Sequence, residues 1–105
     1  MTQRQGKSLT MLGEASRYAD EHPTATVLVI AHTPDFCGYL RELAKSERLS
    51  ARLNFVPVYR ARDVARGKRG EFYVDHAVWQ HHEATVRLER DAWGALVNMR
   101  KGASQ

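Results

Sequence analysis

The stretch Val27-Leu28-Val29-Ile30-Ala31-His32-Thr33-Pro34-Asp35 decides the fold of this chain. Its first five residues are continuously apolar and rich in β-branched side chains, which is typical of a strand covered on both faces of a parallel sheet. Thr33 suits the N-cap of a following helix, Pro34 suits its first turn, and Asp35 complements its dipole. The stretch therefore predicts a buried strand, a short turn and a helix that ends near Glu47.

Further helices and strands alternate on both sides of this unit. Apolar residues at helical spacing predict a helix over residues 8–21, which Pro23 ends. Residues 53–59 and 71–75 are predicted strands, and Pro57 places the first of them at an edge of the sheet or ends its ladder early. The alternation predicts an α/β domain with a short, mostly parallel sheet of about three strands flanked by helices. Right-handed crossovers would bring the strand C-termini to one edge, where ligands bind.

The remaining segments give less distinct patterns. Residues 60–69 are polar and strongly basic, and we expect a loop there. After Asp75 a helical stripe predicts a long helix, although residues 85–100 are also compatible with a hairpin. Trp79 and Trp93 would lie near one face of that helix, where they pack on the sheet or, if partly exposed, mark a partner interface.

Composition indicates one small domain without a membrane segment. The chain has 105 residues, 43% of them hydrophobic, so we expect a single folded domain over 1–105 with flexible tails at 1–7 and 102–105. Lys and Arg number 16 and Asp and Glu 12, and the resulting charge of +4 favours anionic partners. Cys37 is the single cysteine, which fits a reducing compartment such as the cytoplasm and a buried, inert thiol. Neither a bilayer-spanning run nor a signal peptide is apparent.

Two short motifs suggest phosphate chemistry. Gly6-Lys7-Ser8 precedes the first predicted helix, where a phosphate-binding loop places amide groups and a lysine against phosphates and a hydroxyl on Mg²⁺. Phe72-Tyr73-Val74-Asp75 ends a predicted strand on a carboxylate, which can hold the water shell of the same metal. The two motifs together are more specific than either is alone.

With residues 27–32, these motifs resemble the core of a P-loop NTPase over about residues 5–80, closest to helicase and phage terminase ATPases. The resemblance implies that Lys7 and Ser8, after Gly6, are Walker A residues that bind Mg-ATP, and that Asp75 is the Walker B acid. His76 stands where many such ATPases carry a second, catalytic acid. The chain departs from the family because Met1 occupies the position of the first loop glycine and no strand precedes the loop.

The basic segment 60–69 is the best candidate for contact with phosphates of nucleic acid. Its charged residues are Arg60, Arg62, Arg66, Lys68 and Arg69. A solvated loop and an acidic protein partner are the alternatives. Only Tyr59 accompanies these charges, so base stacking is not indicated.

Histidines suggest a second kind of site. His32 follows one predicted strand, and Asp75 and His76 follow another, so all three are expected at the same sheet edge. Such a set can bind a divalent metal, but no metal-ligand spacing such as H-x-x-x-H is present, and capping or packing roles are the simpler interpretation.

The leading hypothesis is a small P-loop-derived protein, phage-associated by resemblance, that binds nucleic acid, a nucleotide phosphate or a protein without turnover. The missing first strand would leave an open sheet edge for a homo-oligomer or for a partner that supplies a strand. One alternative is an active ATPase of DNA translocation or packaging, with Lys7, Ser8 and Asp75 at its centre. A small metal-dependent hydrolase is the other.

Overall fold

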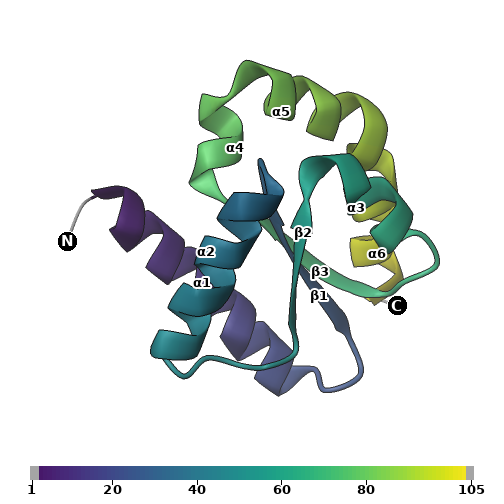
Figure 1. Ribbon diagram of the computed structural model, residues 1–105. Helices are drawn as coiled ribbons and strands as arrows, with labels where there is room; N and C mark the ends of the chain where they lie inside the picture. The colour runs from purple at the N-terminus through teal and green to yellow at the C-terminus, as the bar shows by residue number, and fades with distance from the viewer. Residues whose placement is uncertain (1–2, 104–105) are drawn as a thin grey trace.

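A sheet of parallel strands forms the centre of the computed structural model, which describes residues 3–103 of the chain (Figure 1). Within those residues the strand order is β2-β1-β3. Their bounds are Thr26–Ala31 for β1, Leu53–Pro57 for β2 and Gly70–Val74 for β3. The predicted buried strand is the middle one, and its side chains from Val27 to Ala31 are fully buried because helices cover both faces. The α/β fold with a parallel sheet is therefore confirmed.

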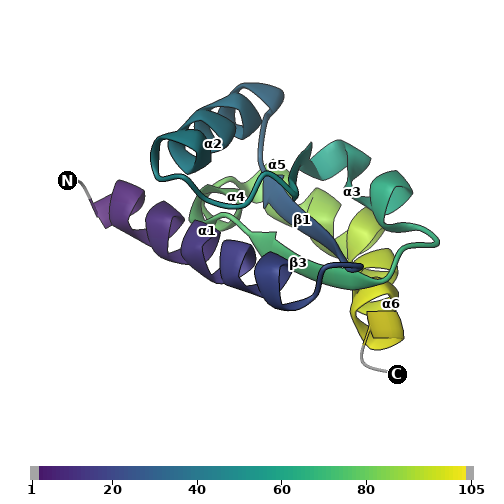
Figure 2. The same ribbon diagram turned by 90° about the horizontal axis from the view of Figure 1, so that it is seen from below.

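Helices form a layer on each face of the sheet (Figure 2). One layer consists of α1 (Gln3–Glu21) and α2 (Pro34–Ser46), which pack on Val27 and Val29. The other layer, which packs on Leu28 and Ile30, consists of α3 (Val58–Ala65), the π-helical turn η1 (Leu88–Ala92) and α6 (Trp93–Ala103). Two short helices, α4 (His76–Gln80) and α5 (His82–Arg87), connect β3 to this second layer. No helix within residues 3–103 is long and apolar enough to cross a membrane.

Local sequence rules account for several of these elements. Thr33 caps α2, and its hydroxyl accepts a hydrogen bond from the Phe36 amide at 3.1 Å. Pro57 ends β2, which lies at an edge of the sheet as expected. The C-terminal segment is helical rather than a hairpin, but it breaks at His81.

Two sequence-based boundaries were wrong. Residues 58–65 form helix α3, where the sequence predicted the end of a strand at 58–59 and a loop from residue 60. The helix forms because Val58, Ala61 and Ala65 recur on one face and are buried, while the charged residues between them lie outside. Helix α1 begins at Gln3, so Gly6-Lys7-Ser8 lies inside the helix and not before it. Residues 3–7 and 102–103, expected in the tails, are likewise helical, and residues 1–2 and 104–105 lie outside the described part.

Two glycines fix the turn between α3 and β3. Gly67 has φ of 72°, a left-handed conformation that side chains disfavour. A Cβ atom on Gly70 would lie 1.7 Å from the carbonyl oxygen of Thr26, so only glycine fits where β3 begins beside β1. The basic residues of this turn are therefore held on a short connection.

Candidate functional site

A buried hydrogen bond joins the two P-loop-like motifs, which lie 67 residues apart in the chain. The Ser8 hydroxyl on α1 donates to Oδ1 of Asp75 at 2.8 Å. Ser8 is 1% exposed and Asp75 is fully buried. The fold thus brings together the hydroxyl and the carboxylate that the sequence paired only by resemblance.

Both carboxylate oxygens of Asp75 are engaged. While Oδ1 accepts from Ser8, Oδ2 accepts from the Ala77 amide at 2.9 Å and so caps helix α4. Each oxygen keeps a second lone pair, but Asp75 is fully buried, so a Mg²⁺ ion with its water shell could reach it only if the packing around it opened. In this arrangement Asp75 acts as an anchor between α1, β3 and α4.

The other predicted P-loop residues are placed differently. Gly6 and Lys7 lie in the first turns of α1, and the Gly6 carbonyl accepts a hydrogen bond from the Thr10 hydroxyl at 3.0 Å. Lys7 is exposed, and its amide lies within a helix rather than in a loop that wraps a phosphate. His76 is the first residue of α4 and is half-buried.

The histidines do not form the metal site that the sequence left open as an alternative. The ring of His32 stacks on that of His81, with centroids 4.3 Å apart and an interplanar angle of 8°, and it contacts the Phe36 ring at 4.9 Å. Within the described residues, no three His, Cys, Asp or Glu side chains are grouped to hold a metal ion, so His32, Asp75 and His76 form no such set. The partner of His32 is an imidazole from the segment after α4, which no spacing rule predicts.

A basic groove lies between the turn after α3 and helix α6. It has a volume of about 650 Å³. Five cationic side chains and one carboxylate line it among the described residues, and these are Arg62, Arg66, Lys68, Arg69, Arg90 and Asp91. A groove with this excess of positive charge attracts anions.

Four of the five predicted cationic residues line this basic groove, and Arg60 does not. Arg60 instead lies with Arg41 beside the outer edge of β2. Arg90, on η1, was missed from the sequence, because only the folding of the C-terminal helix back over α3 brings it there. An exposed arginine on a predicted helix gives no indication of such a neighbour.

Arg69 contacts both the sheet and helix α6. Its backbone carbonyl accepts a hydrogen bond from the Thr26 amide at 2.8 Å. Its side chain passes over Gly102 on α6, where an added Cβ atom would lie 3.1 Å from Arg69 Cγ. The turn that carries Arg66 and Lys68 is thereby tied to both the sheet and α6.

The outer edge of β3 is partly closed. The backbone amide of Asp75 donates to the carbonyl of Ile30 on β1. Residues of a parallel strand alternate in the direction of their backbone groups, so those of Phe72, three residues earlier, point away from β1. The Phe72 amide donates to the Glu71 carboxylate at 2.9 Å, and Arg100, which is ion-paired with Glu71, donates to the Phe72 carbonyl at 3.5 Å. These side chains occupy hydrogen-bonding groups that an added strand would need.

Aromatic residues lie beside the same edge. The Trp93 ring packs edge-on against Phe72 with centroids 5.4 Å apart and contacts Trp79 at 6.5 Å. Trp79 is 45% and Trp93 37% exposed. Both are therefore partly exposed, which is the condition under which the sequence suggested a partner interface. Burial raises the pKa of the neighbouring Tyr73 to about 12, with a further contribution from the Glu71 carboxylate.

Cys37 lies on the buried face of α2 and is 3% exposed. Burial raises the pKa of its thiol, and the positive charge of Arg41 opposes this only in part. A thiol with a raised pKa is a poor nucleophile, as expected of a packing residue.

No protein-family model matches the chain, and neither a curated protein nor a solved structure matches it. The P-loop resemblance therefore stays a prediction, carried by Gly6-Lys7-Ser8, Asp75 and the hydrogen bond that joins them.

Proposed function

We propose that this protein is a P-loop-derived domain that binds nucleic acid through the basic groove and does not hydrolyse nucleotides. The observation that carries the proposal is the lining of the groove, with five cations against a single carboxylate. Salt-dependent contact between lysine or arginine and phosphates is the usual source of sequence-independent affinity for nucleic acid.

The charges of the basic groove are available to a ligand. Ion pairs among the described side chains engage Arg62 with Asp63 at 3.4 Å, but none engages Arg66, Lys68, Arg69 or Arg90. Arg66, Lys68 and Arg69 follow one another closely on the short turn that Gly67 and Gly70 fix. Because the glycines hold the backbone of this turn in one conformation, binding of a phosphate backbone would order only the side chains of these cations.

The absence of turnover is supported by the surroundings of Asp75. Its carboxylate is fully buried and already accepts hydrogen bonds from Ser8 and Ala77, so a hydrated metal ion could reach it only if α1 or α4 moved. Lys7 lies on a helix turn instead of a phosphate loop. We expect no phosphate release from Mg-ATP, and turnover that disappears in Lys7→Ala would favour the ATPase alternative instead.

Partner docking at β3 is a weaker proposal. The edge is flanked by exposed tryptophans, which are common in interfaces, but Glu71 and Arg100 already cover its middle. We therefore place nucleic acid before a homo-oligomer or an acidic protein as the partner.

The direct test is the affinity of the purified protein for a fluorescently labelled oligonucleotide, measured by anisotropy. The test variant carries Arg66→Gln, Lys68→Gln and Arg69→Gln. A matched control removes the same charge from the opposite layer of helices, with Arg17→Gln, Arg41→Gln and Lys45→Gln, all of which are exposed.

We expect the test variant to bind at least about tenfold more weakly at low salt, because charged contacts dominate there, and the control to bind nearly as the wild type does. Equal loss in the two variants would mean that net charge alone drives binding. An undiminished affinity in the test variant would refute a role for the groove.

A further inference from the structure

A second groove opens at the carboxyl ends of β1 and β2 and has a volume of about 800 Å³. We call it the histidine groove. Its ring-bearing and charged side chains are His32, Tyr59, His81, His82, Glu83, Arg87, Arg90 and Asp91. After β1 the chain passes to helix α2 on one face of the sheet, and after β2 it passes to α3 on the other. Ligands of open α/β sheets bind where the helices diverge in this way.

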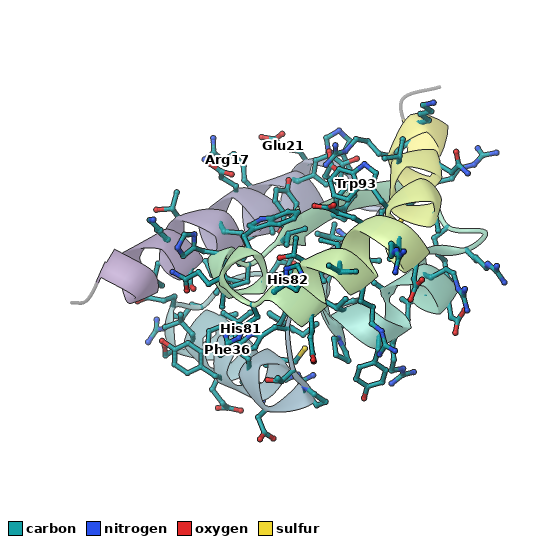
Figure 3. The ribbon with its side chains drawn as sticks, turned by 90° about the horizontal axis from the view of Figure 1, so that it is seen from above. Arg17, Glu21, Phe36, His81, His82 and Trp93 are labelled. Carbon is teal, nitrogen blue, oxygen red and sulfur yellow. The ribbon has the colours of Figure 1, made fainter. Side chains whose placement is uncertain are left out.

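The histidine groove presents flat rings. His81 is exposed and lies parallel to His32 with centroids 4.3 Å apart, and His32 in turn contacts Phe36 of α2. Figure 3 labels His81 and Phe36 at this end of the molecule. Tyr59, at the start of α3, is 53% exposed. Exposed aromatic rings on both sides of a groove are suitable surfaces for a planar heterocycle.

Two arginines and two carboxylates also line this groove, from α5 and η1. Arg87 forms an exposed ion pair with Asp91 at 3.8 Å, whereas no ion pair within the described residues engages Arg90. Arg90 lines the histidine groove and the basic groove alike, so the two grooves adjoin at this residue. An arginine with no carboxylate partner beside flat rings fits a ligand that joins a phosphate to a planar base.

We propose that the histidine groove binds one nucleotide, with its base on the rings and its phosphate on Arg90. The volume lies within the range of about 300–1,000 Å³ that is usual for small-molecule sites. The inference rests on the proposed function only through Arg90, which belongs to both grooves. The nucleotide is either free or the phosphorylated end of a nucleic-acid strand, since both present the same base and phosphate.

The experiment is a titration of the ¹⁵N-labelled protein with adenosine monophosphate in the absence of Mg²⁺, followed by amide chemical shifts. Adenosine without phosphate and a 5′-phosphorylated oligonucleotide are titrated in parallel. Tyr59→Ala and Arg90→Gln test the site, and because both residues are exposed, the variants should fold. Tyr39→Ala and Arg41→Gln remove an exposed ring and an arginine from α2 and serve as the control.

We expect shifts around His81 and Tyr59, and dissociation constants at least about fivefold weaker in Tyr59→Ala and in Arg90→Gln, as for loss of one stacked base or one charged contact. Adenosine should bind more weakly than its monophosphate. Shifts around His81 and Tyr59 with the monophosphate would assign a free nucleotide. The same shifts with the phosphorylated oligonucleotide alone would assign a strand end.

Two results would overturn the inference. One is the absence of chemical-shift changes around His81 and Tyr59 with either phosphorylated ligand at millimolar concentration. The other is binding that survives Tyr59→Ala and Arg90→Gln but is lost in Lys7→Ala, which would place the nucleotide on α1. Neither result affects the proposed function, because that test depends on Arg66, Lys68 and Arg69, which do not line the histidine groove.

Discussion

The hydrogen bond between Ser8 and Asp75 should be a principal stabiliser of the packing of α1 on the sheet. Ser8→Ala removes the donor and leaves Oδ1 of a fully buried carboxylate without its partner. A hydrogen bond to a charged group contributes about 1.5–3 kcal/mol, so we expect the free energy of unfolding to fall by that amount. Because a small domain has about 5–15 kcal/mol of stability in total, the loss should be large enough to measure.

The assay is urea unfolding followed by the fluorescence of Trp79 and Trp93. Ser16→Ala is the matched control, since Ser16 is also buried but its hydroxyl accepts from the backbone amide of Ser50, a neutral partner. That variant should lose about 0.5–1.5 kcal/mol. A double-mutant cycle between Ser8→Ala and Asp75→Ala should give a coupling energy of at least about 1 kcal/mol.

A loss in Ser8→Ala that is no greater than the loss in Ser16→Ala would refute this reasoning. So would a coupling energy near zero in the cycle. Either result would mean that the two motifs are neighbours without being energetically linked.

Three further predictions concern the sheet and its helices. Gly70→Ala should destabilise the protein by at least about 3 kcal/mol, because the added carbon meets the backbone of Thr26, and a wild-type melting temperature would contradict this. Gly38→Ala, inside α2 with open space around it, should raise stability by about 0.5–1 kcal/mol in the same urea assay, and a loss would contradict it. The pKa of Tyr73 is raised from 10 to about 12 in the folded protein, so folding favours the protonated phenol. The contribution of Tyr73 to the free energy of unfolding is therefore complete below pH 10 and declines as the pH rises from about 10 to 12. Tyr73→Phe should flatten that alkaline decline, and an unchanged pH profile of unfolding would count against it.

Local patterns in the sequence were sufficient for the sheet. The run Val27–Ala31 had no polar residue to assign to a solvent face, and Thr33 and Pro34 marked the next helix unambiguously. Pro57 correctly indicated an edge strand, since it lacks the amide that a central strand needs.

Charge density misled the prediction of α3. Arginines and an aspartate surround Val58, Ala61 and Ala65, and alanine contributes little to an apolar stripe even when it is fully buried. A helix that buries only small residues between charged ones therefore resembles a loop in composition, and its packing partner is needed to identify it as a helix.

The candidate site was predictable only in part. Ser8 and Asp75 were singled out by motif, and the structure brings them into contact. The stack of His32 on His81 and the approach of Arg90 to the basic turn depend on how the C-terminal helices fold back over the sheet. No short-range pattern encodes such a path, because it is set by packing between segments far apart in the chain.

The most direct test of the proposed function is the salt dependence of oligonucleotide binding by the wild type and by the variant that lacks the charges of Arg66, Lys68 and Arg69. Each lost phosphate contact reduces the slope of log affinity against log salt by about 0.7 for a single strand, so three lost contacts should reduce it by about 2. The control that lacks the charges of Arg17, Arg41 and Lys45 should keep the wild-type slope. Equal slopes in all three proteins would contradict the proposal that the basic groove holds the phosphate backbone.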